Sequence, residues 1–417
     1  MLFPPPIVRA GPPVVWVALA ATPTPLAARA QVSPTPATAP APRQAQWRAG
    51  ASDTATATRA DSVPADSAGP PPRVGPRRAK RFALHGYATQ AYAGLRGGVQ
   101  FYGIRDRASA NFRYAALQGR YALTDADRVT VQLSHRQLGD SPISDFDPDV
   151  KLNWAFYEHA FGDGTTVRLG RSPIPRGIYN QLRSVGVALP TFRPPVVFYD
   201  EGAYYSETIN GVVASRTFFA ERPWSLDAHA YGGGWSTLIY DTWSPTYSVG
   251  RTHARRAVGG QLWLNTPLDG VRLGAAAQRY NLSGPGVDVS DTKEYHVSAD
   301  ATRERGFVRA EAQLQNYGTD KFISSYAQLG ARLVGQLHGV VEFQRSYDTD
   351  VTYGGGTLPS SYAWHRSNGV GLSYAFAPTL VAKLEQHWDR GIQLEQPGDP
   401  MNPPRFRYAI ASLSTSF

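Results

Sequence analysis

The sequence contains 417 residues, of which 18% are charged and 12% aromatic, with 40 glycines and no cysteine. The lack of cysteine excludes thiol catalysis, disulfide bonds and thiolate metal sites, and no apolar run approaches the roughly 20 residues of a membrane-spanning helix. The net charge is +9, but residues 1–80 carry 9 basic and 3 acidic side chains, leaving 33 basic and 30 acidic ones, a net +3, for residues 81–417. Such a small excess does not indicate a nucleic-acid partner.

The first 80 residues predict a secretion signal and a linker. Residues 14–21 (VVWVALAA) form a short apolar stretch, and Ala28-Arg29-Ala30 provides an A-x-A cleavage site after it. This arrangement predicts a signal peptide over residues 1–30. An apolar stretch within a disordered tail is the alternative, because Arg9 is the only charge before it. Residues 31–80 are mainly Ala, Pro, Thr and Ser, too poor in apolar surface to fold, and are predicted to be an Ala/Pro-rich disordered linker.

From Arg81 onward, apolar and polar residues alternate in windows of about ten residues. In residues 307–317 (FVRAEAQLQNY) the apolar side chains fall on one face and the Arg, Glu and Gln side chains on the other, and residues 128–136 and 379–389 alternate in the same way. A half-buried strand of a soluble sheet shows the same period, which therefore does not decide the fold alone. Repeated windows of this length, with small and aromatic residues on the apolar face, are typical of a transmembrane β-barrel.

The connections between these windows alternate between long loops and short turns. Eight long loops and seven short turns predict sixteen strands with both chain ends on one side of the membrane; fourteen and eighteen strands are the alternatives. Asn210-Gly211 resembles a hairpin turn, but a turn there would break the alternation, so we interpret it as a bulge within the sixth strand. The predicted long loops are residues 93–108, 138–150, 172–202, 234–254, 282–292, 318–323, 348–365 and 390–404. The predicted short turns are near residues 124–127, 162–164, 221–223, 266–270, 303–306, 335–337 and 377–378.

The last predicted strand, residues 405–417 (RFRYAIASLSTSF), alternates and stops on Phe417. In this feature the sequence resembles bacterial outer-membrane β-barrel proteins, whose last strand typically ends in Phe and is read by the barrel-assembly machinery. Thr415 departs from the aromatic residue that the family often has at this position. With sixteen strands, the resemblance is to porins. It implies an all-β fold, a transmembrane antiparallel β-barrel over residues 81–417 with a long inward-folded third outer loop, and a homotrimer in the bacterial outer membrane.

The longest connection, residues 172–202, has the ordinal position of the third outer loop, which narrows the pore of these porins. The resemblance therefore places the pore constriction in this segment, where clustered arginines favour anions. The alternative is that these arginines pair with acidic groups and only hold the loop in position. The predicted constriction residues are Arg171, Arg176, Arg183, Arg193, Asp200 and Glu201. The predicted lumen-facing wall residues are Arg128, Arg136, Arg272, Arg309, Glu311, Lys383 and Glu385.

Two further patterns have alternative interpretations. Aromatic residues along the strands predict girdles at the membrane interfaces, with a sugar-guiding track as the alternative. The acidic loop 140–149 (DSPISDFDPD) lacks the ligand spacing of an EF-hand, so we expect a solvated loop and no metal site. The predicted girdle residues are Tyr92, Trp154, Tyr157, Trp224, Trp263, Tyr374 and Trp388.

The sequence contains no G-x-S-x-G, H-E-x-x-H, Walker or G-x-G-x-x-G motif, so we expect neither an enzyme nor a cofactor. The prediction is an outer-membrane porin for passive diffusion of small hydrophilic solutes, with a mild preference for anions. The alternatives are a substrate-selective channel for phosphate-like anions and a non-conducting barrel that acts as an adhesin, anchor or outer-membrane hydrolase. Expected partners are outer-membrane lipid, small hydrophilic or anionic solutes, the barrel-assembly machinery and further copies of the chain, and no nucleic acid.

Overall fold

The structure is a computed structural model, and the predicted signal peptide and linker lie outside the residues that it describes. The described residues are 81–146, 150–199, 206–241, 248–284, 287–317, 320–348, 352–353, 356–357, 363–396, 399 and 401–417.

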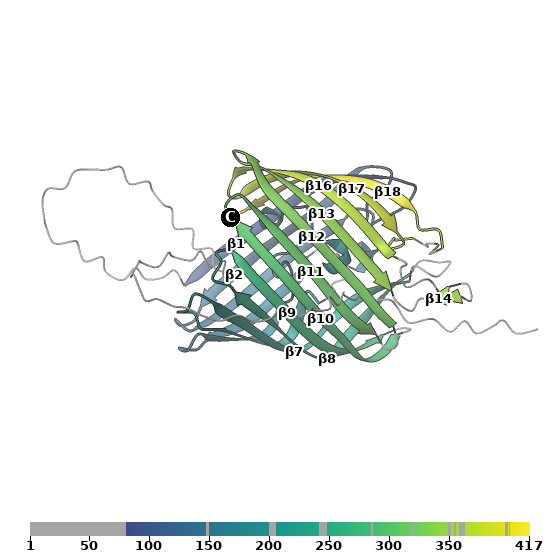
Figure 1. The fold of residues 1–417 in the computed structure, drawn as a ribbon. Helices are drawn as coiled ribbons and strands as arrows, with labels where there is room; N and C mark the ends of the chain where they lie inside the picture. Colours follow the sequence, from purple (N-terminus) through teal and green to yellow (C-terminus); the bar gives the residue numbers. More distant parts are fainter. Residues whose placement is uncertain are drawn as a thin grey trace, which may run out of the picture.

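Sixteen antiparallel strands form a closed barrel, in which each strand pairs with its neighbours in the chain and β1 closes the sheet against β18 (Figure 1). Short turns lie at one end, called the turn end here, and long connections at the other, called the loop end. The barrel strands are β1 Phe82–Arg96, β2 Ser109–Ala122, β3 Asp127–Leu138, β4 Lys151–Ala160, β5 Thr165–Pro173, β6 Thr208–Phe218, β7 Ser225–Asp241, β8 Ser248–Asn265, β9 Val271–Gly284, β10 Val287–Arg303, β11 Gly306–Tyr317, β12 Asp320–Val334, β13 Leu337–Asp348, β16 Ala363–Ala377, β17 Leu380–Gly391 and β18 Arg405–Ser416.

The remaining elements lie in the long connections at the loop end. They are η1 Pro142–Phe146, η2 Gly186–Ala188, α1 Val196–Tyr199 and the two-stranded hairpin of β14 Thr352–Tyr353 and β15 Gly356–Thr357. Among the described residues, no helix is long and apolar enough to cross a membrane.

The predicted sixteen-stranded antiparallel barrel is confirmed, whereas some predicted boundaries are wrong. The Asn210-Gly211 pair lies inside β6, as predicted, but both residues pair with β5 and β7 without a register shift, so they form no bulge. The predicted loops 234–254 and 282–292 are mostly strand, because β7 to β10 extend beyond the predicted ends. Bulges between Gly233 and Trp235, and between Arg255 and Val258, interrupt the alternation there, which explains why the sequence resembles a loop.

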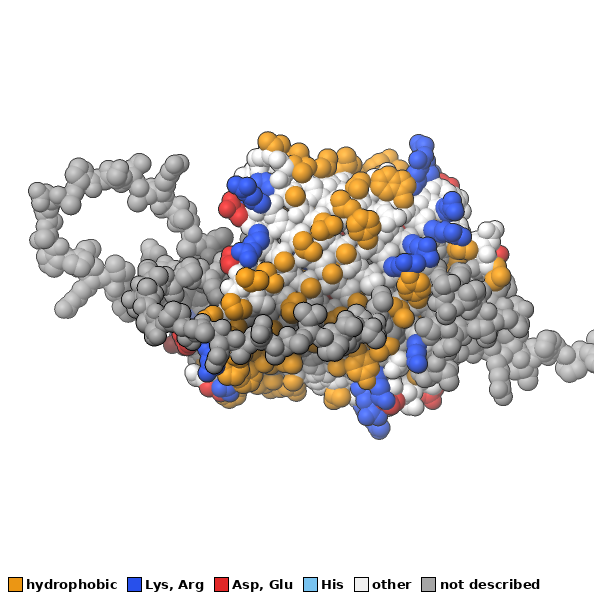
Figure 2. Space-filling model, in the orientation of Figure 1, with side chains coloured by type: hydrophobic (Ala, Val, Ile, Leu, Met, Phe, Trp, Pro, Cys, Tyr) orange, Lys and Arg blue, Asp and Glu red, His pale blue; other side chains and the backbone are white. Residues whose placement is uncertain are grey.

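The two faces of the wall differ as the alternation predicts. Along β17, Leu384 is 57% exposed while the neighbouring Glu385 is 3% exposed, because odd and even positions of a strand face opposite sides. Figure 2 shows the result on the visible outer surface, where apolar side chains cover the middle of the wall and charged side chains lie towards its two ends. An apolar outer band with a polar interior is the arrangement of a membrane barrel.

Phe417 lies where β18 pairs with β1 and closes the barrel. Its backbone N–H donates to the carbonyl of Gly86 (3.0 Å), and its carbonyl accepts from the N–H of Gly86 (3.1 Å). A Cβ atom at position 86 would overlap the Phe417 ring. Glycine is therefore required at this position for the ring to cover the outer surface of β1.

Candidate pore constriction

The segment between β5 and β6, residues 174–199, packs against the inward-facing side chains of the barrel. Ile174, Arg176 and Tyr199 are each at most 1% exposed. The segment forms backbone hydrogen bonds of its own, such as that from the Leu182 N–H to the Tyr179 carbonyl (2.8 Å), and side chains of the wall bind further polar groups of its backbone. We call it the β5–β6 segment.

Glu311 of β11 is the first anchor of the β5–β6 segment. Its carboxylate accepts from the Ile178 backbone N–H (3.0 Å) and from the Tyr199 hydroxyl of the segment. It also accepts from the hydroxyls of Ser298 and Tyr326 on the wall (both 2.6 Å). Four donors on one buried carboxylate offset much of the cost of removing it from water. Glu311, predicted as a lumen wall residue, therefore faces inward but binds the segment.

Lys383 and Glu385 of β17 form the second anchor. The Lys383 ammonium donates to the carbonyls of Gly186 (2.6 Å) and Thr191 (2.8 Å), and the Glu385 carboxylate accepts from the Phe192 N–H (2.5 Å). Both wall side chains are at most 4% exposed. Like Glu311, they are inward-facing and engaged by the segment.

Two of the predicted constriction arginines are held within the protein. Arg176 donates to Gln313 (2.6 Å) and to the carbonyl of Phe198 (3.3 Å), and its Nε lies 3.9 Å from a Glu294 carboxylate oxygen. Arg193 lies against aromatic rings, with its guanidinium carbon 5.1 Å from the centre of Tyr102. Arg176 thus lies near an acidic group of the wall, as in the alternative interpretation, whereas Arg193 is engaged by aromatic rings.

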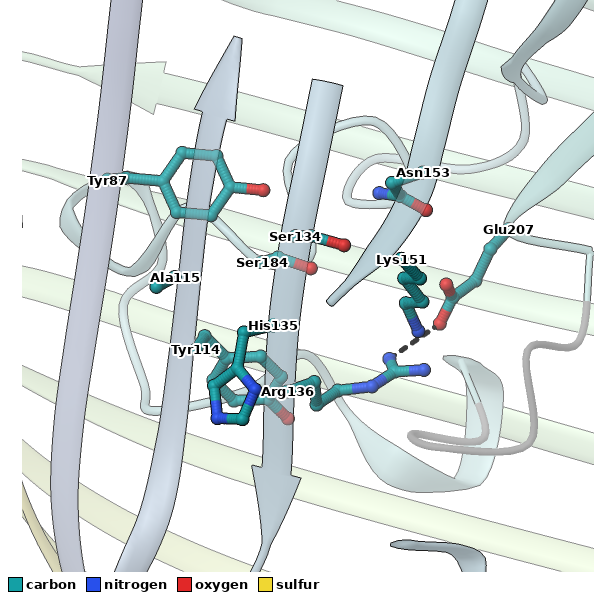
Figure 3. A pocket seen from close by; sticks show the side chains of 10 residues that line it. All are labelled: Tyr87, Tyr114, Ala115, Ser134, His135, Arg136, Lys151, Asn153, Ser184 and Glu207. Carbon is teal, nitrogen blue, oxygen red and sulfur yellow. Dashed lines mark hydrogen bonds and ion pairs between the residues drawn. The ribbon is translucent and has the colours of Figure 1, made fainter. Parts of the chain in front are cut away.

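The third arginine, Arg183, lies beside an opening between the β5–β6 segment and the wall formed by β1 to β4. It lines an adjoining opening, which shares Tyr87, Asn153, Ser184 and Glu207 with the first. Glu207, which directly precedes β6, accepts from Arg136 (2.8 Å) and lies 3.5 Å from the Arg183 Nε. Figure 3 shows Arg136 and Glu207 joined by this hydrogen bond, with the Lys151 ammonium beside them. The first opening offers about 10 Å³ to the centre of a water molecule, which is room for about one water molecule. Its lining residues are Tyr87, Tyr114, Ala115, Ser134, His135, Arg136, Lys151, Asn153, Ser184 and Glu207.

The charges around Glu207 outweigh its burial. Burial alone would raise the pKa of this carboxyl, but the guanidinium groups of Arg136 and Arg183 and the Lys151 ammonium hold the pKa well below its usual range. The carboxylate therefore stays ionised at neutral pH, and one negative charge is shared between two guanidinium groups. The opening keeps an excess of positive charge.

The same ratio of two arginines to one carboxylate occurs twice at the turn end of the interior. Glu158 lies 3.2 Å from Arg128 and 2.6 Å from Arg168. Asp300 likewise binds two predicted wall residues, Arg272 (2.9 Å) and Arg309 (3.2 Å). The side chains of Arg128 and Arg272 are 34% and 36% exposed. These inward-facing groups therefore contact solvent inside the barrel.

Three predicted residues are not at this site. Arg171 pairs across the sheet with Ala155, which pairs with the exposed Val131, so its backbone position belongs to the outward face of the wall. Its outward position follows from the alternation of β5, since Leu169, two positions before it, is 48% exposed on the outer face and the strand continues for two more residues after Arg171. Asp200 and Glu201 lie outside the described residues.

The sequence did not identify Glu207, Lys151, Glu158 or Asp300 as site residues. Glu158 and Asp300 do occupy polar positions of alternating strands, so strand pairing was the missing information. Trp263, predicted in an outer girdle, is instead 5% exposed inside the barrel, where the Arg272 guanidinium carbon lies 4.2 Å from its ring centre. Its ring covers Gly274 of the neighbouring strand, where a Cβ atom would be 2.8 Å from the ring.

The loop end also contains an apolar cluster inside the barrel that the sequence did not predict. It joins residues of the first and last long connections with the β5–β6 segment and with inward-facing wall residues, among them Phe101, Phe192, Phe322, Leu394 and Tyr408. Tyr114 of β2 belongs to this cluster and also lines the opening described above, so the cluster borders that opening.

Comparison with solved structures shows the same fold. A complex of OmpF from Salmonella typhi with daunomycin aligns with a TM-score of 0.54 and 13% identity, covering 81% of this chain and 97% of that one. The outer membrane channel DcaP of Acinetobacter baumannii aligns with a TM-score of 0.51 and 10% identity, again over 81% and 97%. No family model and no curated protein matches the sequence. The chain thus shares its fold with outer-membrane porins, as the resemblance implied.

Proposed function

We propose that the protein is an outer-membrane porin that lets small hydrophilic solutes diffuse through a water-filled channel and prefers anions. The observation that carries this proposal is the repeated sharing of one carboxylate by two guanidinium groups, at the opening beside Glu207 and around Glu158 and Asp300. Low-dielectric walls concentrate the field of such unbalanced charges on any solute that passes.

The location in a membrane is supported by the outward apolar band and by the fold shared with OmpF and DcaP. A homotrimer is proposed from polar side chains on the outward face of β1 to β3. Gln90 pairs across the sheet with Arg113, whose Nε lies 2.9 Å from the His135 ring. Polar groups that face hydrocarbon are costly, so contact with further copies of the chain would give them a suitable environment.

A substrate-selective channel for phosphate-like anions is the second candidate. It is favoured by the three basic side chains around Glu207: Arg136 and Lys151 line one narrow opening, and Arg183 lines the adjoining one. Guanidinium groups in such a cluster bind phosphate oxygens as well as carboxylates. The two candidates differ in whether the solute saturates the channel.

The test is the reversal potential of the refolded full chain in a planar bilayer under a KCl gradient. Reversal towards the anion potential is the expected result. Addition of inorganic phosphate then separates the candidates, because block of the chloride current that saturates indicates a selective site and a linear response indicates passive diffusion. Cation-side reversal would overturn the anion preference, and a folded barrel without conductance would overturn the porin.

A further inference from the structure

Four arginines form an in-register row across the outer surface of β13, β16, β17 and β18. Arg345 pairs with Arg366, Arg366 with Arg390, and Arg390 with Arg405. All four side chains are exposed and face away from the barrel interior. Neighbouring strands lie about 4.8 Å apart, so the row places four guanidinium groups along about 15 Å of surface.

Such a row is unfavourable for the barrel by itself, because like charges directly opposite each other across a sheet are destabilising. Within the described part of the chain, no carboxylate forms a salt bridge with any of the four guanidinium groups. Arg345 instead stacks on the Tyr347 ring, with its guanidinium carbon 4.7 Å from the ring centre. Two more arginines, Arg407 and Arg96, pair with each other beside the row. The row therefore lacks an anionic partner on its own chain, within the residues described.

The row lies where a membrane surface would meet the barrel. Each of its residues is within three positions of the loop end of its strand. The next outward positions towards the turn end include Phe343 and Trp388, both 46% exposed, and further along lie Val370 and Leu384. Aromatic side chains mark the interfacial level and the aliphatic ones the hydrocarbon. In Figure 2, Lys and Arg side chains likewise gather beyond the apolar band at the loop end.

We propose that this arginine row binds the phosphate groups of anionic lipids in the membrane leaflet at the loop end. Guanidinium groups bind phosphate oxygens in pairs of parallel hydrogen bonds, and a layer of lipid phosphates offers several acceptors at the spacing of the row. The lipid supplies the negative charge that the outer face of these four strands lacks, so β13, β16, β17 and β18 are fully stable only in an anionic leaflet. The inference rests on the membrane location proposed above but not on conduction.

The experiment compares the full chain with the variant R345Q/R366Q/R390Q/R405Q. A matched control, R216Q/R222Q/R303Q/R332Q, removes the same charge from exposed positions at the turn end. Each refolded protein is titrated in neutral detergent with dimyristoyl phosphatidylglycerol, dimyristoyl phosphatidylcholine or inorganic phosphate. The temperature of barrel unfolding is measured, and bound lipid is counted by native mass spectrometry.

For the wild type and the control variant, phosphatidylglycerol should raise the unfolding temperature, and lipid molecules should remain bound in the mass spectrum. Phosphatidylcholine should have neither effect. In the row variant, the half-saturating phosphatidylglycerol concentration should rise at least tenfold, since each basic residue near an anionic surface contributes about a fivefold factor. In detergent alone the row variant should unfold at a higher temperature than the wild type, because the repulsion is removed.

Equal phosphatidylglycerol dependence of the wild type and the row variant would overturn the proposal, as would equal effects of the two lipids. An effect of inorganic phosphate as strong as that of the lipid would assign the row to a free anion instead. If the row variant lost self-association in detergent and kept its lipid dependence, the partner would be a second copy. If the protein did not conduct but its unfolding temperature still depended on phosphatidylglycerol, the proposed porin function would be wrong and the inference about lipid binding would still hold.

Discussion

The charge balance at the opening depends on Glu207, and Glu207→Gln changes that charge while keeping the side-chain size. The carboxylate lies 2.8 Å from the Arg136 Nη1 and 3.5 Å from the Arg183 Nε, and all three side chains are at most 9% exposed. The variant leaves two buried guanidinium groups without their shared counter-charge. Permeating anions would then be the available partners, so the variant should be more anion-selective than the wild type.

The expected magnitudes follow from this geometry. The formal charge of the cluster of Glu207, Arg136 and Arg183 rises from +1 to +2, and removal of one partner of a buried ion pair costs about 3–5 kcal/mol of folding free energy. Under a tenfold KCl gradient, a perfectly anion-selective pore reverses at about 59 mV in magnitude. The reversal potential of the variant should move from the wild-type value towards that limit, and the barrel should unfold at a lower urea concentration.

The pH dependence gives an independent readout of the same residue. Because the guanidinium groups hold the pKa of Glu207 below its usual range, the carboxylate contributes stability above the unfolded-state pKa of about 4.3. That contribution is lost as the pH falls through the lower folded-state pKa. The reversal potential of the wild type should thus stay constant from pH 7 to about pH 5. It should approach the reversal potential of Glu207→Gln only in stronger acid.

A matched control is Glu304→Gln, which removes a carboxylate that is 84% exposed at a short turn. This variant should keep the wild-type reversal potential. Identical reversal potentials for the wild type and Glu207→Gln at pH 7 would refute the reasoning, because they would mean that solutes do not pass the opening beside Glu207.

Three further predictions concern the segments that line and cover the interior. Arg183→Ala should shift the reversal potential towards cations, whereas Arg193→Ala should not, because its guanidinium lies against aromatic rings; equal shifts would contradict this placement. Glu311→Ala should lower the unfolding temperature and raise single-channel conductance, since each of its four donors left unsatisfied costs about 1–3 kcal/mol, and an unchanged conductance would mean that the β5–β6 segment does not limit the pore. Burial raises the pKa of Glu395, although the Gly103 N–H and the Ser141 hydroxyl donate to its carboxylate, so the loop packing around this buried side chain is most stable below its unfolded-state pKa and weakens as the pH rises through the raised value. Proteolysis of the loops should be faster at pH 8 than at pH 5 in the wild type and independent of pH in Glu395→Gln; the same pH dependence in both would exclude Glu395 as its cause.

The strand pattern could be predicted from the sequence because the side chains of each strand alternate between two environments, whichever strands lie beside it. Lipid outside and polar groups inside impose a period of two, and the alternation of long and short connections follows from chain direction alone. The Glu207 pair could not be predicted in this way. Its partner Arg136 is 71 positions away, and only the barrel's closure and the course of the β5–β6 segment bring the two side chains together.

Trp263 and Phe101 illustrate the same limit for apolar residues. Aromatic side chains in a barrel sequence favour the outer girdle, and on that rule Trp263 was placed outside. Inside, however, Gly274 leaves room for its ring, and Arg272 stacks on it. Phe101 belongs to a long connection, where the local sequence does not indicate burial, yet it packs on Tyr408 at 5.5 Å between ring centres. The Phe101 contact depends on a residue distant in the sequence, whereas the Trp263 contacts depend on the register between the adjacent strands β8 and β9, which the alternation alone does not give.

The proposed anion preference does not follow from the total charge of the barrel, which is only +3 over residues 81–417. It follows from which charged side chains the β5–β6 segment covers and which remain exposed to solvent. Glu311 and Glu385 accept hydrogen bonds from the β5–β6 segment and are at most 3% exposed, so their charges are directed at protein donors. Arginines such as Arg128 and Arg272 share their carboxylates and remain about one-third exposed inside the barrel. A solute in the channel would meet mainly the basic groups, because the segment that narrows the interior also covers these acidic ones.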